Sequence, residues 1–264
     1  MAEEHFIEAG DNRLHAVVEG AKGAPWLTCL HTLASNLSLW DDQAPALGKS
    51  FRLLKLDARG HGRSNAERPA ASLDDLVADV VSVWDALGVE RSLVLGISLG
   101  GMTGVGLALT HPTRVTKLVA ADCRLDSPAF FVDMWTQRMK QLREDGLATV
   151  ADVTMPIWFT EKTRKERPEI VARARAMIVG TSEAGYVGAG RALQKLDYKR
   201  RLGEIRCPTL FVVGELDGPH PNEIREFAKM APGARFVEIA GVAHASNLEA
   251  PERFTEIVLD FLKS

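Results

Sequence analysis

A serine framed by glycines is the residue of this chain best suited to chemistry. Residues 93 to 101 read Leu-Val-Leu-Gly-Ile-Ser-Leu-Gly-Gly, an apolar strand pattern that passes through G-x-S-x-G into an apolar helix pattern. This context is typical of a nucleophile elbow, a sharp strand-to-helix turn that leaves the serine hydroxyl exposed. The flanking glycines fit that turn, because a Cβ there would strike the strand or helix packed alongside. We therefore predict that Ser98 is a nucleophile.

A serine hydroxyl needs a base to remove its proton and an acid to orient that base. His244 lies in a loop after the last predicted strand, and we expect it to be the base. Asp217 follows the predicted strand 209–213 in a turn framed by glycine and proline, and we expect it to be the acid. The order serine, aspartate, histidine is the one that an elbow of this kind uses. Asp122 and Asp126, just beyond the preceding strand, are the rival acids.

An acyl transfer also needs hydrogen-bond donors for the oxyanion that develops on the substrate. The backbone N–H of Leu99, the residue after the nucleophile, is one expected donor. The second is expected in the loop after the predicted strand 26–30, at the N–H of Leu33. His31 in the same loop is interpreted as an organiser of that loop rather than as a second base.

A charged turn, Asp-Ala-Arg-Gly-His-Gly-Arg-Ser, occupies residues 57 to 64. Its glycines predict a tight, irregular path, on which Asp57, Arg59 and His61 could brace one another. A metal or phosphate site is disfavoured, because the turn lacks a helix-opening Gly-Lys-Ser/Thr and no second ligand cluster has metal spacing. The chemistry predicted here requires no metal and no cofactor.

These residues must be positioned by an alternation of short strands and longer helices, which is typical of an α/β fold with a mostly parallel sheet and helices on both faces. Gly10-Asp11-Asn12 predicts a hairpin turn, so the sheet is expected to begin antiparallel. The predicted strands span 6–8, 14–18, 26–30, 51–56, 93–95, 115–121, 209–213 and 235–239, and the predicted helices span 72–87, 100–110, 223–230 and 251–262. Ser72 followed by Asp75 resembles a capping box.

One stretch, from about Ser127 to about Leu202, breaks the alternation. It carries helical periodicity, charge and two tryptophans, but no convincing strand. We interpret residues 127–202 as a helical cap over the sheet and residues 1–126 with 203–264 as the core domain. A separate helical domain is the less favoured alternative, because the alternation of strands and helices resumes at Thr209 with the same core character.

Composition restricts the class of protein. The 264 residues are 46% hydrophobic and 25% charged, with a net charge of −3, so no basic footprint suggests nucleic acid. No polybasic arm or long apolar run suggests a membrane, and the acidic, polar start does not resemble a signal peptide. Three cysteines without C-x-x-C spacing are expected to be buried free thiols. We expect a cytoplasmic protein with a small-molecule substrate; its oligomeric state does not follow from the sequence.

Taken together, these motifs resemble the α/β-hydrolase superfamily over essentially the whole chain. The turn at 57–64, the elbow at 96–101, Gly-Glu-Leu-Asp at 214–217 and Gly-Val-Ala-His at 241–244 occur in superfamily order. Within it, the chain looks most like the 3-oxoadipate enol-lactonases. The stretches that carry this likeness are 34–43, 158–160, 173–178, 185–188 and 243–251.

The chain departs from the lactonase pattern in two places. Residues 31–34 read His-Thr-Leu-Ala, where relatives usually have His-Gly or Ser-Asn-Ser-Leu-Gly, and residues 122–126 read Asp-Cys-Arg-Leu-Asp in place of a small polar run. Arg124 could therefore grip a substrate carboxylate from the pocket floor. It could equally pair with a neighbouring aspartate and only shape the loop. Trp135 and Trp158 could line the pocket or belong to the core of the cap.

The resemblance and the residues together predict a serine hydrolase that cleaves a small ester or lactone, such as a carboxylated enol-lactone, through an acyl-enzyme. Carbon–carbon bond hydrolysis, amide hydrolysis or a perhydrolase side activity on the same triad are alternatives, because function is set by the site rather than the fold. A ligand receptor that kept a hydrolase fold is an alternative from another class. It is disfavoured, because a binding protein has no need of a strained elbow.

Overall fold

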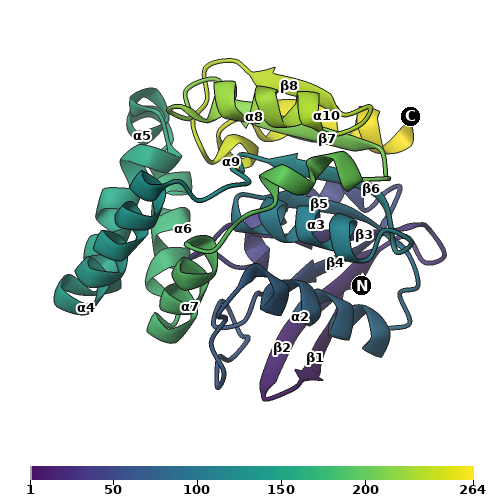
Figure 1. Ribbon diagram of the computed structural model, residues 1–264, viewed down its shortest axis with the longest axis horizontal. Helices are drawn as coiled ribbons and strands as arrows, with labels where there is room; N and C mark the ends of the chain where they lie inside the picture. The colour runs from purple at the N-terminus through teal and green to yellow at the C-terminus, as the bar shows by residue number, and fades with distance from the viewer. Residues whose placement is uncertain (1) are drawn as a thin grey trace.

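The computed structural model describes residues 2–264, and within them eight strands form a single sheet (Figure 1). The strand order is β1-β2-β4-β3-β5-β6-β7-β8. Strand β2 pairs antiparallel with β1 and β4, whereas the pairings β4-β3, β3-β5, β5-β6, β6-β7 and β7-β8 are parallel. The strands are β1 (Glu3–Ala9), β2 (Asn12–Gly20), β3 (Trp26–Leu30), β4 (Arg52–Leu56), β5 (Ser92–Ile97), β6 (Val115–Ala121), β7 (Thr209–Gly214) and β8 (Arg235–Ile239).

Burial explains why the central strands read as continuous apolar runs. Every residue of β4, β5 and β7 is buried, as expected for parallel strands that helices cover on both faces. Strand β1 at the edge is largely exposed, and its hairpin with β2 turns at Gly10, whose φ is 62°. The predicted fold class and the antiparallel start of the sheet are confirmed.

The core helices are also close to their predicted bounds. Helix α2 begins with the predicted capping box, in which the Ser72 N–H donates to Asp75 Oδ2 at 3.0 Å. Helix α8 begins three residues earlier than predicted, at His220, because Pro221 can occupy the first turn of a helix. The core helices and 3-10 turns are η1 (Leu37–Trp40), α1 (Ala44–Leu47), α2 (Leu73–Ala86), α3 (Leu99–Thr110), η2 (Lys199–Glu204), α8 (His220–Met230), α9 (Ser246–Glu249) and α10 (Pro251–Lys263).

Four consecutive helices lie between β6 and η2, in the segment that we call the cap (residues 127–198). They are α4 (Ala129–Trp158), α5 (Glu161–Glu166), α6 (Pro168–Val179) and α7 (Glu183–Leu193). Helix α4 is kinked at Gly146, where φ is 77°. Figure 1 shows the four helices together at one side of the sheet, next to α9.

The cap is seated on the core through close backbone contacts. A Cβ on Gly185 of α7 would lie 2.4 Å from the carbonyl oxygen of Gly60, so the two glycines meet without side chains between them. Ser182 donates to the same oxygen from its backbone N–H at 3.0 Å and from its hydroxyl at 2.9 Å. On the other flank, the Ala245 N–H donates to the carbonyl of Trp158 at 2.9 Å. These contacts place the cap over the end of the sheet at which the predicted site residues lie.

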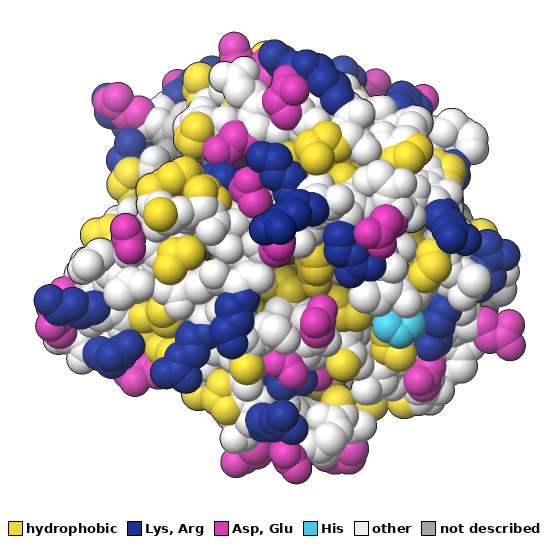
Figure 2. Space-filling view, in the orientation of Figure 1, with side chains coloured by type: hydrophobic (Ala, Val, Ile, Leu, Met, Phe, Trp, Pro, Cys, Tyr) yellow, Lys and Arg dark blue, Asp and Glu magenta, His cyan; other side chains and the backbone are white. Residues whose placement is uncertain are grey.

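The surface carries both signs of charge. Figure 2 shows Lys and Arg interspersed with Asp and Glu, with hydrophobic side chains between them. Within residues 2–264, no helix is long and apolar enough to cross a membrane. The three cysteines, Cys29, Cys123 and Cys207, are free and buried, as predicted, and burial raises the pKa of the Cys29 thiol to about 12.

Candidate active site

Ser98 stands at the junction of β5 and α3 with a strained backbone. Its φ of 52° and ψ of −116° are unusual for a residue with a side chain, and such strain typically costs about 1–3 kcal/mol. A Cβ on Gly96 would lie 2.2 Å from the carbonyl oxygen of Gly100, and one on Gly100 would lie 2.1 Å from that of Leu30. The two glycines are therefore required sterically, which is the geometry expected of a nucleophile elbow.

The loops after β7 and β8 bring Asp217 and His244 together. Asp217 Oδ2 lies 2.9 Å from His244 Nδ1, and the aspartate side chain is 4% exposed. Because an ionised carboxylate only accepts hydrogen bonds, Nδ1 carries the proton, and Nε2 of a neutral imidazole is left as the acceptor. Ser98 and His244 line the same cavity. Among residues 2–264, no hydrogen bond joins the two, and in unliganded enzymes such contacts are often long.

The surroundings of His244 favour its protonated form. Burial of the imidazole opposes a positive charge, but the charge and hydrogen bond of Asp217 outweigh it and raise the pKa of His244 above its ordinary 6.5. An imidazolium formed by taking a proton from Ser98 would therefore be stabilised in place.

Within residues 2–264, neither rival acid forms a hydrogen bond or ion pair with His244. Asp126 forms ion pairs with Arg124 at 2.8 Å and with Lys199 at 3.2 Å. Asp122 lines the cavity, but its carboxyl group bonds to the backbone of Gly214 and to the hydroxyl of Ser246. Asp217 is thus the carboxylate that contacts the predicted base.

The cavity has a volume of about 160 Å³ and lies between the cap and the core. Trp135 and Trp158 both line it, and both are nearly fully buried, at 6% and 5% exposure. The two alternatives for these tryptophans therefore coincide, because each is part of the cap's core and also presents a surface to the cavity.

Arg124 lines the cavity but is bonded to protein carboxylates. Its Nη2 lies 2.8 Å from Asp126 Oδ1, its Nη1 lies 3.0 Å from Glu223 Oε2, and its Nε donates to the Asp126 carbonyl at 3.1 Å. Glu223 also accepts from the ring of His220 at 3.0 Å. In the structure, Arg124 therefore pairs with a neighbouring aspartate, which is the second of the two alternatives considered for this residue. A substrate carboxylate would have to displace one of these partners.

A second arginine that lines the cavity, Arg138, was not identified from the sequence. Within residues 2–264 it forms no ion pair, and its guanidinium lies 5.4 Å from the centre of the Trp135 ring. Two more donors that line the same cavity, Trp135 Nε1 and the Tyr186 hydroxyl, are buried without a hydrogen-bond partner. Arg138 lies one helical turn after Trp135 in α4, and this spacing was the available signal, because residues three apart share a helix face.

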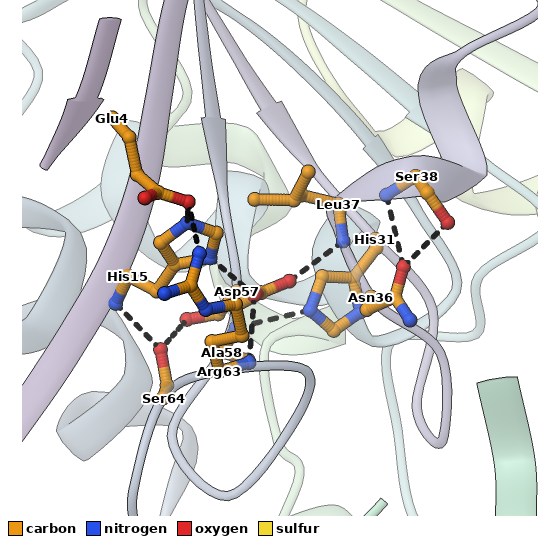
Figure 3. Close-up of polar contacts among 10 residues, drawn as sticks. All are labelled: Glu4, His15, His31, Asn36, Leu37, Ser38, Asp57, Ala58, Arg63 and Ser64. Atoms are coloured by element: carbon orange, nitrogen blue, oxygen red, sulfur yellow. Dashed lines mark hydrogen bonds and ion pairs between the residues drawn. The ribbon is translucent and has the colours of Figure 1, made fainter. Parts of the chain in front are cut away.

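The loop between β3 and η1, in which Leu33 lines the cavity, is held by His31 (Figure 3). The Ala58 N–H donates to His31 Nε2 at 2.9 Å, so Nδ1 carries the proton and donates to the Thr32 carbonyl at 2.7 Å. Burial lowers the pKa of His31, which keeps the ring neutral. These contacts fit the interpretation of His31 as an organiser. Leu99 begins α3, and the N–H groups of a first helical turn have no partner within the helix.

Asp57 is the centre of a second set of contacts that shapes the same loop (Figure 3). Its Oδ1 accepts from the Leu37 N–H at 2.7 Å, and its Oδ2 bonds to His15 Nδ1 at 2.7 Å and to the Arg63 N–H at 2.9 Å. The expected brace among Asp57, Arg59 and His61 forms only in part: His61 Nδ1 bonds to the Arg59 carbonyl oxygen at 3.0 Å, but the side chains of Asp57 and Arg59 do not bond to each other within residues 2–264. Asp57 is engaged by other donors, and Arg59 reaches away to a buried carboxylate on α2.

Comparison with known proteins agrees with this geometry. Residues 25–251 match the family described as the alpha/beta hydrolase fold, and the chain belongs to that family. It is a hydrolase of carboxylic esters or lactones.

Its similarities are more specific than the fold. The chain is 29% identical to 3-oxoadipate enol-lactonase 1 of Acinetobacter baylyi, over 100% of this chain and 99% of that protein. It is 33% identical to the enol-lactonase of Burkholderia xenovorans LB400, whose crystal structure superposes with a TM-score of 0.93 over 98% of this chain and 100% of that one. It is also 29% identical to a 2-hydroxy-6-oxononadienedioate/2-hydroxy-6-oxononatrienedioate hydrolase of Paraburkholderia phymatum, over 98% of this chain and 94% of that protein.

Proposed function

We propose that the enzyme opens a small lactone or ester by a Ser98–His244–Asp217 triad through an acyl-enzyme. The observation that carries this proposal is the 2.9 Å contact between Asp217 and His244 in a cavity that Ser98 also lines from a strained elbow. Within residues 2–264, no cluster of three or more His, Cys, Asp or Glu residues could hold a metal ion.

The proposed reaction has two halves. In the first, His244 Nε2 takes the proton of Ser98 Oγ as that oxygen attacks the carbonyl carbon. Asp217 holds the imidazolium, and the N–H groups of Leu33 and Leu99 receive the negative charge on the carbonyl oxygen. The imidazolium then gives its proton to the leaving oxygen, which leaves an ester on Ser98. In the second half, His244 removes a proton from water, and the resulting attack releases the carboxylic acid and restores the serine.

We further propose that the substrate carries a carboxylate, which Arg138 binds together with Trp135 Nε1 and the Tyr186 hydroxyl. All three residues line the cavity: Arg138 forms no ion pair within residues 2–264, and Trp135 Nε1 and the Tyr186 hydroxyl are buried, a state that is costly for a donor unless a ligand satisfies it. The printed names of the relatives support this proposal, because an oxoadipate and a nonadienedioate are both dicarboxylates. Arg138 thereby takes the role that the sequence suggested for Arg124.

The test compares substrates with and without a carboxylate: 3-oxoadipate enol-lactone, neutral γ-lactones, and p-nitrophenyl acetate and butyrate. Ser98→Ala should reduce kcat on every substrate by at least about 10⁴-fold while the protein still folds, as judged by circular dichroism. Retained turnover would refute the serine mechanism. A carbon–carbon ring-cleavage substrate added to the panel tests the alternative that the Paraburkholderia relative suggests.

Arg138→Gln should raise KM for the carboxylated lactone by about 10- to 100-fold, because a charge-assisted hydrogen bond contributes about 1.5–3 kcal/mol. Turnover of p-nitrophenyl acetate should change little. Arg143→Gln is the matched control, since Arg143 lies on the same helix but is exposed. Broad esterase activity that is indifferent to Arg138 would contradict the anionic substrate.

A further inference from the structure

A second buried carboxyl group, that of Asp122, lies beside the proposed triad and has no part in the mechanism above. Asp122 directly follows β6, is 1% exposed and has a φ of 46°, a conformation that residues with side chains rarely adopt. Its backbone N–H donates to the Val212 carbonyl of β7 at 2.9 Å, which fixes the residue against the neighbouring strand. The backbone conformation of Asp122 therefore fixes the place that its side chain reaches.

That place is the junction between the two loops that carry Asp217 and His244. Asp122 Oδ1 accepts from the N–H of Gly214, the last residue of β7, at 2.9 Å. Oδ2 lies 2.5 Å from the hydroxyl of Ser246, two residues after His244. One side chain thus ties the start of the Asp217 loop to the end of the His244 loop.

The two loops are in direct contact at this point, so a small displacement of one loop would also displace the other. A Cβ on Gly214 would lie 2.2 Å from the carbonyl oxygen of Ala243, the residue before His244. The bond between Asp217 and His244 spans the same two loops at 2.9 Å. Asp122 directly follows a third strand, β6, and its hydrogen bonds connect the end of that strand to both loops.

The charge of Asp122 decides whether it supports or competes with Asp217. The titratable groups that face it are Asp217 on the β7 loop, His244 on the β8 loop and its own neighbour Cys123. Burial, and then the charge of Asp217, raise the pKa of Asp122 to about 8, against the opposing influence of His244. Two adjacent carboxylates rarely ionise together, and the raised pKa of Asp122 favours its uncharged form at neutral pH.

We propose that Asp122 is a positioning residue, whose carboxyl group clamps the loop of Asp217 to the loop of His244. This proposal rests on the triad proposed above. The Asp122 carboxyl group presents two oxygens, one that accepts from the Gly214 N–H and one that accepts from the Ser246 hydroxyl. Asparagine keeps an acceptor for the Gly214 N–H and can donate from its amide nitrogen to the Ser246 hydroxyl oxygen without a charge, whereas alanine presents neither group.

The experiment compares Asp122→Ala, Asp122→Asn and Ser246→Ala with the wild type on p-nitrophenyl acetate, which carries no carboxylate. Asp122→Ala should lower kcat by about 10- to 100-fold with little change in KM, the loss expected when a catalytic pair is displaced by about 1 Å. Asp122→Asn should restore kcat to within about threefold of the wild type. Its pH profile of kcat/KM on the acid side should match that of the wild type.

Two results would overturn the proposal. Wild-type kcat in Asp122→Ala would show that the clamp is not needed. An acid limb displaced to lower pH in Asp122→Asn would show that Asp122 is charged and acts directly on His244. If Asp122→Ala fails to fold, Ser246→Ala removes one end of the clamp and should lower kcat by about 3- to 10-fold, and an unchanged kcat counts against the proposal. Activity in Ser98→Ala refutes the triad itself, whereas an inactive Ser98→Ala with a fully active Asp122→Ala refutes only the clamp.

Discussion

At the scale of single residues, the site depends on groups whose partners are fixed by the backbone. Ser98 sits in a strained turn that two flanking glycines make possible, and Asp217 holds one nitrogen of His244 so that the other is free. Burial alone would make His244 a weak base, and the aspartate reverses that effect on its pKa. The pH dependence of activity should therefore depend on Asp217.

Asp217→Asn tests this dependence. The base must be neutral to accept the serine proton, so activity of the wild type should rise with pH as it passes through the raised pKa of His244, above 6.5. Loss of the Asp217 charge lowers that pKa, so the acid limb of kcat/KM should move to lower pH. At the same time, kcat should fall by about 10³- to 10⁴-fold, because the tautomer is no longer fixed.

The control for this prediction is the double variant with Asp122→Asn. Asp217 raises the pKa of Asp122, so its removal lets Asp122 ionise more readily and partly sustain the charge beside His244. The double variant should therefore show a larger displacement of the acid limb than Asp217→Asn alone. An acid limb that stays in place in both would exclude Asp217 as the partner of the base.

At the scale of elements, the turn 57–64 connects the sheet, helix α2 and the cap. Arg59 crosses to Asp79 of α2 with two contacts of 2.6 Å, and both side chains are less than a tenth exposed. Burial nevertheless raises the pKa of Asp79, because desolvation outweighs the attraction of Arg59. The fold therefore fixes Arg59 and Asp79 next to each other, and each buried charge is compensated by the other.

Arg59→Ala should lower the free energy of unfolding by about 3–5 kcal/mol, because it leaves a buried charge without its partner. The double variant Arg59→Leu/Asp79→Leu should regain most of that loss, since no buried charge remains. Urea unfolding followed by tryptophan fluorescence measures both. Equal destabilisation by the single and double variants would mean that packing of the arginine side chain, rather than charge, dominates.

At the scale of the whole molecule, the cavity exists only because the cap rests on the core. The donors proposed for the substrate carboxylate come from α4 and α7, whereas Ser98, Asp217 and His244 come from the sheet. The backbone contact between Gly60 and Gly185 sets the separation of these two halves. A shift of the cap would therefore change binding and turnover together.

Gly185→Ala should destabilise the protein by about 1–3 kcal/mol, the usual effect of overpacking, because its Cβ would lie 2.4 Å from the Gly60 oxygen. It should also raise KM for the carboxylated lactone more than for p-nitrophenyl acetate. Gly203→Ala is the matched control, since its Cβ would meet nothing nearer than 4.0 Å. Thermal unfolding and steady-state kinetics measure the two effects. A melting temperature in Gly185→Ala equal to that of the control would contradict the seating of the cap described here.

Much of the architecture followed from local patterns. Strands β3, β6 and β8 have their predicted bounds, because short runs rich in β-branched and apolar residues, bounded by turn residues, favour strands. The strand-to-helix turn around Ser98 could be predicted for a similar reason: its glycines are required by atoms of nearby residues and of the adjacent strand. The kink at Gly146 and the early start of α8 could not be predicted from the sequence, because the ends of elements depend on backbone conformation that helix and strand propensities do not fix.

The sequence by itself determined the fold class, the strand-to-helix turn at Ser98 and the chain order of serine, aspartate and histidine, because each is a local pattern or an order along the chain. Only the tertiary structure decided which charges are free. Arg124 and Arg138 are both arginines near the predicted pocket, yet Arg124 meets Asp126 and Glu223, and Arg138 meets neither. Glu223, a partner of Arg124, lies 99 residues away in the chain. The two meet because β6, which precedes Arg124, pairs with β7, which precedes the helix α8 that carries Glu223.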